Sequence, residues 1–415
     1  MSIFAVLAGS TSLHAADFDL GAKATNQLGL DLHRQLSRGA ENLCLSPYSI
    51  QSALAMTFAG ADGETRAEMA RVLHFPTEGE WVHASFAALQ SSLNEMAKNT
   101  QKIAEQSKKR VGPSEPITLS IANRLFAQSG YDFRDSFREL LKKFYGAPFE
   151  TLDFKKDPEG ARGHINKWVA DQTRDRIRDL VPQGGIKELT RLVLANAIYL
   201  KAPWQSEFND AFTKPRPFHV HGGDAVDAPT MKKVAQFGYA KVEGYSVVAV
   251  PYSGSELQFL ILLPDQVNGL AKLESKLSAE MLARCAKLEP HDVDLELPKF
   301  KFAPPTIPLG ETLQALGMKT AFDVPQGSAN FDKMSPRKPD KYLAISNVFH
   351  KTFIAVDEKG TEAAAATAVV MMELSARLEK PKEPIQVKMD RPFLYAIQHV
   401  PSGACLFIGR VTDPR

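Results

Sequence analysis

The sequence predicts one large α+β domain, and three observations support this fold class. Apolar residues at helical spacing dominate the first half of the chain, whereas short strand patterns dominate the second half. Helices and strands therefore do not alternate as they do in a doubly wound sheet. No linker or shift in composition divides the 415 residues, a length that is sufficient to bury a large core.

Helices are predicted where apolar residues recur at intervals of three and four. Leu28, Leu32 and Leu36 give the first helix one apolar face. Gly60 breaks the second helix and Gly146 ends a later one, because glycine disfavours a continued helix. The predicted helices span residues 21–37, 49–58, 64–73, 81–96, 136–145, 160–180, 270–288 and 311–316.

Strands are predicted where apolar residues alternate with polar ones or run continuously between turn signals. Residues 192–200 are almost all apolar, which indicates a strand that is buried on both faces. Residues 293–302 alternate strongly, as in a strand with one buried face. The other predicted strands span residues 117–126, 218–220, 234–239, 247–250 and 257–263.

Composition and motifs argue against several classes of function. The net charge of +2 gives no reason to expect nucleic acid or a membrane as a partner. Three cysteines do not make a disulfide framework. We find no nucleophile elbow, zinc-protease motif, dinucleotide fingerprint or P-loop, and we expect no cofactor. His219 and His221 lack a third ligand nearby, so no metal site is predicted. The sequence therefore does not predict an enzyme, although a catalytic triad from distant positions is left open.

Residues 1–18 are predicted to lie outside the domain, which spans residues 19–415. An apolar stretch over residues 3–9 precedes the small residues Ala15 and Ala16, as in a short secretory signal. The stretch is short, however, and no Lys or Arg comes before it. We predict a secreted protein, extracellular or periplasmic, with a cytoplasmic location as the alternative.

The most informative segment begins where a predicted strand ends at Val356. Gly360 follows shortly, and it allows the backbone to hinge because it has no Cβ. The alanines that come next lack bulk, so the segment is able to slide between two existing strands. An exposed helix is the alternative interpretation, since alanine is the best helix former. The run after Gly360 reads Thr361, Glu362, Ala363, Ala364, Ala365, Ala366 and Thr367.

This run resembles the hinge of the reactive-centre loop in the serpin family, whose pattern is complete over residues 358–367. Further blocks resemble serpin segments in order and spacing, namely residues 42–50 (NLCLSPYSI), 196–204 (NAIYLKAPW) and 390–411. The resemblance extends from about residue 19 to the end of the chain. It implies a serpin fold with three β-sheets, about eight or nine helices and an exposed reactive-centre loop over residues 358–385.

The resemblance also implies a function, that of a suicide substrate for a serine protease. The protease attacks a bait bond in the loop and forms an acyl-enzyme, and the cleaved loop then enters a sheet as a new strand. About fourteen inserted residues would move the protease by roughly 45 Å. A dozen new hydrogen bonds would contribute on the order of 10 kcal/mol, so the intact fold would be metastable. The implied partner is the covalently bound protease, and the implied state is a monomer.

Side-chain alternation in the run agrees with insertion into a sheet. If Thr361 faces the core, so do Ala363, Ala365 and Thr367, all of which are small or carry a hydroxyl group. Glu362 then faces outward, where a carboxylate has no burial cost.

Three polar residues match a cluster that serpins have beneath the opening of the sheet. They are Ser49, Asn196 and His350. Their alternative interpretation is ordinary buried polar residues with hydrogen-bond partners.

Two further residues match positions at the top of the serpin sheet. Trp204 matches an aromatic residue there, with plain core packing as the alternative. Lys299 matches the partner of Glu358 in an ion pair, although exposed pairs contribute little. Ala202 departs from the family, which usually has glycine at this position.

The bait bond is predicted between Leu374 and Ser375, because the scissile residue in the family lies fourteen positions after the hinge glycine. A leucine there suits chymotrypsin-, elastase- or subtilisin-like proteases, which have an apolar primary pocket. Met371, Met372 and Arg377 are the alternatives, and Arg377 would attract trypsin-like enzymes.

The loop departs from the family beyond the predicted bait bond. Residues 377–384 make it longer than usual and are rich in Lys, Glu and Pro. A solvated extension and an exosite for the protease are the two interpretations of this stretch.

Two other functions compete with inhibition of a serine protease. One is inhibition of a papain-like cysteine protease, and the other is a non-inhibitory serpin that acts as a carrier or chaperone. Non-inhibitory members usually have bulky, charged or proline residues in the hinge, whereas residues 361–367 are small apart from one glutamate. The sequence therefore favours an inhibitor.

Overall fold

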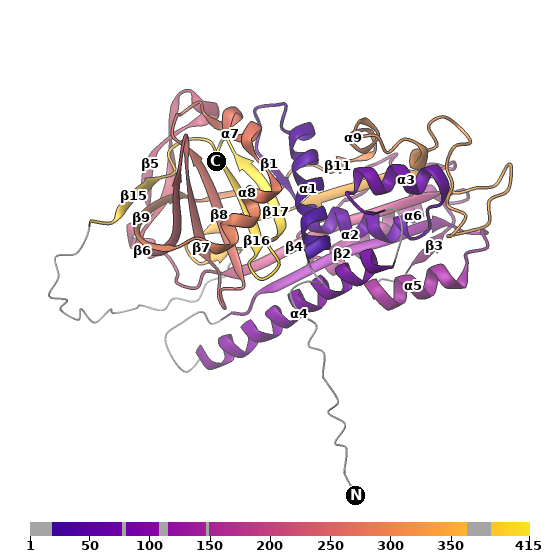
Figure 1. Cartoon of the computed structure of the whole chain (residues 1–415), viewed down its shortest axis with the longest axis horizontal. Coiled ribbons are helices and arrows are strands. Elements are labelled where there is room, and N and C mark those ends of the chain that lie inside the picture. The colour runs from indigo at the N-terminus through magenta and orange to yellow at the C-terminus, as the bar shows by residue number, and fades with distance from the viewer. Residues whose placement is uncertain (1–18, 77–79, 108–114, 147–148, 363–382) are drawn as a thin grey trace, which may run out of the picture.

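The computed structural model describes residues 19–76, 80–107, 115–146, 149–362 and 383–415. Over these residues the chain has the predicted α+β architecture. Most of the helices lie at one end of the molecule, and the strands within residues 214–298 and 385–411 lie at the other (Figure 1).

The nine described α-helices follow the order of the eight predicted ones, and one predicted helix is divided in two. They are α1 (Asp19–Leu36), α2 (Pro47–Phe58), α3 (Gly63–Val72), α4 (Trp81–Ser107), α5 (Asp135–Tyr145), α6 (Pro158–Gln172), α7 (Leu270–Lys276), α8 (Ala279–Arg284) and α9 (Gly310–Ala315).

The described strands cover all those predicted from the sequence and add several short ones. They are β1 (Leu43–Leu45), β2 (Thr118–Gln128), β3 (Glu150–Leu152), β4 (Leu192–Pro203), β5 (Lys214–His219), β6 (Ala225–Val242), β7 (Tyr245–Pro251), β8 (Leu257–Pro264), β9 (Pro290–Pro298), β10 (Phe300–Phe302), β11 (Ile307–Pro308), β12 (Ile345–Thr352), β13 (Ile354–Asp357), β14 (Gly360–Thr361), β15 (Ile385–Lys388), β16 (Phe393–His399) and β17 (Ala404–Val411). The prediction of one strand over residues 293–302 was wrong, because this stretch is divided into two strands that belong to different sheets.

Hydrogen bonds join the described strands into an eight-stranded and a nine-stranded sheet. The eight-stranded sheet has the order β10-β13-β14-β4-β12-β11, with β2 on β4 and β3 on β2. The nine-stranded sheet has the order β1-β17-β16-β8-β7-β6-β9-β15, with β5 on β6. The resemblance implied three sheets, whereas the hydrogen bonds of the described strands define two. Two of the expected sheets are joined into the nine-stranded one by the long strand β6. It pairs with β9 from Thr230 to Gly238 and with β7 from Gly238 to Val242.

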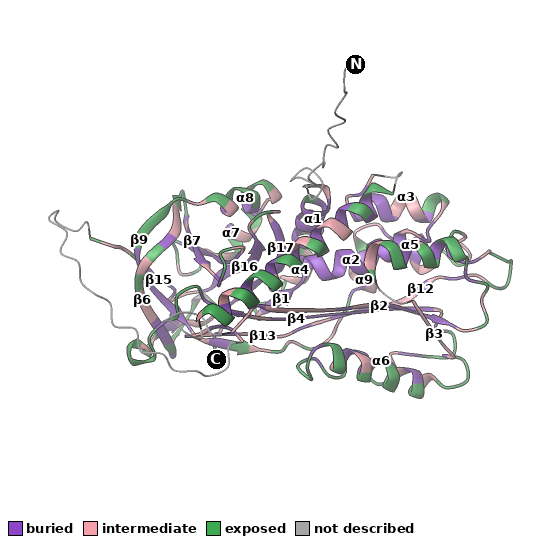
Figure 2. Ribbon diagram, turned by 90° about the horizontal axis from the view of Figure 1, so that it is seen from below, coloured by how far each residue is buried: buried purple, intermediate pink, exposed green. Residues whose placement is uncertain are grey.

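The eight-stranded sheet is covered by helices on both faces (Figure 2). α2 packs against β2 and β4 and is buried along its whole length, and α6 packs against the same two strands from the other side. The predicted strand over residues 192–200 is confirmed, since each of these residues in β4 is buried. A strand enclosed in this way has to be apolar, and a polar residue within it requires a partner.

The prediction of a helix over residues 160–180 was wrong beyond Gln172. The Thr173 hydroxyl donates to the Val169 carbonyl and accepts the Ile177 amide N–H, which closes a turn after α6. Arg174 and Asp175 have left-handed backbone angles, with φ of 51° and 61°. The apolar residues that suggested a longer helix pack into the core from this turn instead; they are Ile177, Leu180 and Val181.

The prediction of one helix over residues 270–288 was also wrong. Leu277 has extended backbone angles, with φ of −59° and ψ of 128°, and separates α7 from α8. Ser278 then caps α8 by accepting the Met281 amide N–H. A serine within an apolar periodic stretch is therefore a helix start here, as its preference for caps indicates.

Candidate functional site

The candidate site lies at one end of the eight-stranded sheet, where two neighbouring strands part. β12 pairs with β4 in parallel as far as Thr352, which lies opposite Ile198. Beyond this point β14 lies between β13 and β4, with Thr361 opposite Val356 on one side and Ala202 on the other. The first two residues of the predicted loop run thus form a short strand in the gap between the two long strands.

Gly360 shows why this run has to begin with glycine. A Cβ atom on residue 360 would lie 2.1 Å from the Ala202 carbonyl oxygen, which is far inside van der Waals contact. The alternative interpretation of the run as an exposed helix is wrong for Gly360 and Thr361, because both pair as strand on both sides. The rest of the predicted hinge after Glu362, residues 363–367, lies outside the described residues.

Thr361 faces the inside of the molecule and is 2% exposed. Its hydroxyl shares a hydrogen bond with the Tyr252 hydroxyl. The Tyr252 ring is buried and stacks on the Trp204 ring at a centroid distance of 4.6 Å and an angle of 9°. Sequence reasoning missed Tyr252, which follows β7 and belongs to no motif. The two stacked rings form the apolar surface against which β14 packs.

Trp204 also holds the turn between β13 and β14. Its indole Nε1–H donates to the Asp357 carbonyl at 2.9 Å, and its amide N–H donates to the Lys359 carbonyl at 2.8 Å. The Trp204 side chain therefore contributes more than apolar packing, because its indole N–H satisfies a carbonyl group of the turn.

Glu358 lies in the same turn and is 6% exposed. Its carboxylate accepts hydrogen bonds from Lys299 Nζ and Thr213 Oγ1, both at 2.7 Å. Burial acts to raise the pKa of Glu358, but the hydrogen bonds from Lys299 and Thr213 outweigh it and lower the pKa below its ordinary value. The structure brings Lys299 and Glu358 together as the sequence resemblance implied, with Glu358 buried rather than exposed. Thr213 was missed.

Ser49, Asn196 and His350 meet in the middle of the same sheet and are completely buried. Asn196 lies beside His350 in the register of β4 and β12, and Ser49 reaches it from α2. Asn196 Nδ2 donates to Ser49 Oγ at 2.6 Å, and Asn196 Oδ1 accepts from His350 Nδ1. The three residues and Asn123, described next, form what we call the polar cluster.

Asn123 on β2 completes the polar cluster and was not predicted. Its Oδ1 accepts from Ser49 Oγ at 3.0 Å, and its Nδ2 donates to the Ser49 carbonyl at 3.0 Å. A signal was present in the sequence, because Asn123 interrupts the alternating apolar positions Ile121 and Leu125. A polar residue at such a position predicts a polar partner across the core.

His350 is neutral and has a defined tautomer. Its Nε2 accepts the Ser46 amide N–H at 3.1 Å, so the proton resides on Nδ1 and is donated to Asn196. Burial lowers the pKa of His350 to about 3. A protonated ring would lose the bond from Ser46, which explains why the site disfavours the charged form.

We expect His350 to make the folded protein less stable in acid. An unfolded histidine binds a proton near pH 6.5, whereas folded His350 does so only near pH 3, so the unfolded chain holds more protons between these values. Stability then falls as the pH drops below about 6.5, by up to about 1.4 kcal/mol per pH unit. His350→Gln should reduce the loss between pH 7 and pH 4.5 by about 2 kcal/mol in urea titrations. His291→Gln, at an exposed position, is the control. An equal loss of stability between pH 7 and pH 4.5 in both variants would contradict the role assigned to His350.

Several predicted features lie outside the described residues and stay predictions. They are the bait bond Leu374–Ser375, the alternatives Met371, Met372 and Arg377, residues 377–382 of the loop extension and the amino-terminal segment on which export depends. Among the described helices, none has the length and apolar character needed to cross a membrane. The described residues also contain no group of three His, Cys, Asp or Glu side chains placed to hold a metal ion.

Comparisons with known proteins agree with one another. The family model described as "Serpin (serine protease inhibitor)" matches residues 23–414. The leukocyte elastase inhibitor of Bos taurus is 37% identical over 402 residues, which cover 94% of this chain and 98% of that protein. An uncharacterised serpin-like protein of Thermococcus kodakarensis is 37% identical over 395 residues, which cover 94% of this chain and 85% of that protein.

Solved structures give the same result. The crystal structure of maspin matches with a TM-score of 0.82 at 26% identity and covers 96% of this chain and all of that one. The crystal structure of uncleaved ovalbumin matches with a TM-score of 0.78 at 26% identity, covering 95% of this chain and all of that one.

Proposed function

The chain belongs to the serpin family, and from this premise we propose that it inhibits a serine protease by acting as a suicide substrate. The loop over residues 358–385 presents the bait bond, and the protease that cleaves it is held as a covalent one-to-one complex with the monomer. The family is one of protease inhibitors rather than of enzymes, and the leukocyte elastase inhibitor is among the relatives of this chain. We propose a chymotrypsin-, elastase- or subtilisin-like target.

The observation that carries the proposal is the position of β14 between β13 and β4. A strand that is to be inserted after cleavage needs a start in the correct sheet and register, and Gly360 and Thr361 already pair with both neighbours. Apart from Glu362, the residues that would follow as far as Thr367 are small. The first added residues would pair with strands that lack partners at this end, and further insertion would replace the single pairing of β12 with β4 by two pairings with the new strand, which supplies the driving force.

In the proposed reaction, the serine hydroxyl of the protease attacks the carbonyl carbon of Leu374. An ester bond to the protease forms, and the peptide bond to Ser375 breaks, with the nitrogen of Ser375 taking the proton to become a free amine. Hydrolysis of the ester would release the protease. Insertion of the loop competes with this hydrolysis. It moves the ester-bound protease along the sheet before water can cleave the ester.

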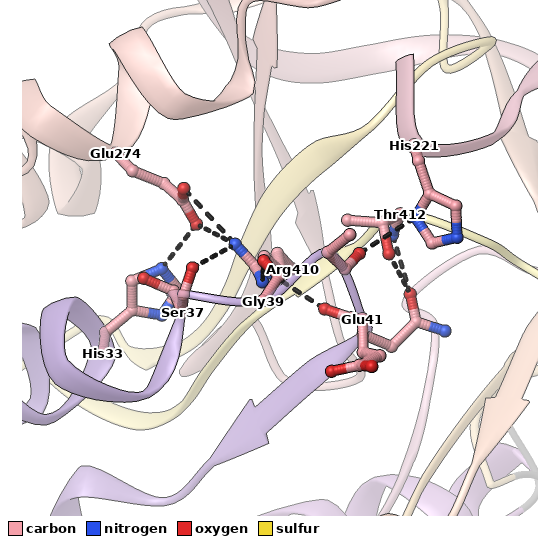
Figure 3. Close-up of polar contacts among 10 residues, drawn as sticks. His33, Ser37, Gly39, Glu41, His221, Glu274, Arg410 and Thr412 are labelled. Atoms are coloured by element: carbon pink, nitrogen blue, oxygen red, sulfur yellow. Dashed lines mark hydrogen bonds and ion pairs between the residues drawn. The ribbon is translucent and has the colours of Figure 1, made fainter. Parts of the chain in front are cut away.

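The segment after the bait bond should remain attached once the bond is cut, because it contains β16 and β17. Arg410 on β17 is 4% exposed and donates to the carbonyls of Ser37 and Glu41 at 2.9 and 3.0 Å (Figure 3). It also pairs with Glu274 at 3.1 Å. These contacts tie the carboxy-terminal strand to the segment after α1 and to α7, so the fragment should separate only under denaturing conditions.

The test is to mix the protein with chymotrypsin, elastase, subtilisin and trypsin in separate, near-equimolar reactions. We expect a complex that survives SDS with one of the first three, and a carboxy-terminal fragment whose mass places its start at Ser375. A start at Leu378 would move the bait bond to Arg377. Cleavage by all four enzymes without any complex would contradict the proposed inhibition and leave a protein that is only a substrate.

A further inference from the structure

Glu362 is the residue at which β14 stops. Its amide N–H still donates to the Ala355 carbonyl at 2.8 Å, so its backbone remains attached to β13. Its φ is 44°, however, which is the left-handed region and is incompatible with an extended strand. A residue with a Cβ in this conformation is disfavoured and persists only where contacts hold it.

The Glu362 carboxylate forms an ion pair with Arg176, and the Tyr199 side chain lies beside the same carboxylate. Arg176 Nε donates to Glu362 Oε1, and the Glu362 side chain is only 11% exposed although it lies on the outer face of the sheet. Burial raises the pKa of Glu362, while Arg176 and Lys201 act in the opposite direction. A carboxylate in such a place depends on its cationic partner more than one in open water does.

Arg176 is itself fixed by the turn that follows α6. Its amide N–H donates to the Thr173 carbonyl at 3.0 Å, and the next residue, Ile177, is completely buried. Lys351 on β12 donates to the Arg178 carbonyl at 2.8 Å, which ties the turn to the sheet. The guanidinium group is therefore presented by a rigid part of the outer face and not by a free loop.

Any lengthening of β14 has to undo this arrangement. Glu362 has to change from a left-handed to an extended backbone, and this change of φ reorients its side chain relative to Arg176. Residue 363 becomes available for pairing between β13 and β4 only after this change. Rearrangement of the ion pair is therefore part of the first step of insertion.

We propose that Arg176 is a positioning residue that holds Glu362 at the end of β14 and so restrains insertion of the loop. This inference rests on the proposed function, because it concerns the rate of the insertion on which inhibition depends. The restraint keeps the uncleaved loop from entering the sheet, and it also sets how fast the cleaved loop enters.

The test compares insertion rates of the whole protein and of Arg176→Ala. Thermolysin, a metalloprotease that forms no acyl-enzyme, is added in excess to cut the loop. Tryptophan fluorescence follows insertion, because Trp204 directly follows β4 and lies beside the gap that the loop would enter. We expect insertion to be up to about fivefold faster in Arg176→Ala. Arg178→Ala is the matched control, since Arg178 lies on the same turn and its side chain pairs with Asp175 instead.

A double-mutant cycle separates the ion pair from other effects of the substitution. Glu362→Gln should accelerate insertion as Arg176→Ala does, and the double variant should be no faster than either one. Equal rates in Arg176→Ala and Arg178→Ala, slower insertion, or additive effects in the double variant would each overturn the proposal. The experiment needs no covalent complex, so it stays informative if inhibition of serine proteases is not found.

Discussion

Thr361→Arg should turn the protein from an inhibitor into a substrate of its target protease. Thr361 is 2% exposed and lies against Tyr252, so an arginine in the inserted strand has to bury its charge in an apolar core. Burying an unpaired charge costs at least several kcal/mol, which is comparable to the gain from the first inserted hydrogen bonds. We therefore expect insertion of the variant loop to be slower than hydrolysis of the ester, so that the protease is released.

The measurement is the stoichiometry of inhibition, read from the ratio of SDS-stable complex to cleaved protein on denaturing gels. We expect complex to fall by tenfold or more while the rate of cleavage is unchanged. Ala364→Arg is the matched control, because alternation predicts that residue 364 faces outward. Full inhibition by Thr361→Arg would contradict insertion of the loop, and equal loss in both variants would contradict the predicted alternation.

Asn196→Ala should cause the largest loss of stability among substitutions in the site. Asn196 is completely buried and bonds to Ser49, Asn123 and His350, so its removal leaves buried polar groups without partners. Each unsatisfied group costs about 1–3 kcal/mol, and the cavity adds to the loss. We expect a total of about 3 kcal/mol.

Urea unfolding followed by circular dichroism measures this loss as a lower midpoint at an unchanged slope. Asn347→Ala is the control, since Asn347 lies on the neighbouring strand, is half-buried, and donates a single hydrogen bond to the Gly185 carbonyl at 2.9 Å. The Asn347→Ala substitution should lower the free energy of unfolding by less than about 1.5 kcal/mol. An equal loss of unfolding free energy in the two variants would mean that the polar cluster stabilises the sheet no more than a single hydrogen bond does.

Most helices and strands were predictable because their periodicity reports local geometry. The apolar run in β4 and the leucines of α1 each indicate the face that an element buries, whatever it packs against. The errors have the same origin. Thr173 and Ser278 end or start helices through side-chain hydrogen bonds, and the periodicity of the apolar residues around them continues past these points.

The sequence by itself determined the family, the small residues of the hinge and the position of its glycine. These features are local, since they depend on which residues are small and which have a Cβ. Only the tertiary structure decided that Tyr252 receives Thr361, that Asn123 joins the polar cluster and that Arg176 pairs with Glu362 at the end of β14. Arg176 and Glu362 are 186 positions apart. Contacts at such separations are set by strand register and by the packing of helices on the sheet, and no short-range pattern in the sequence encodes them.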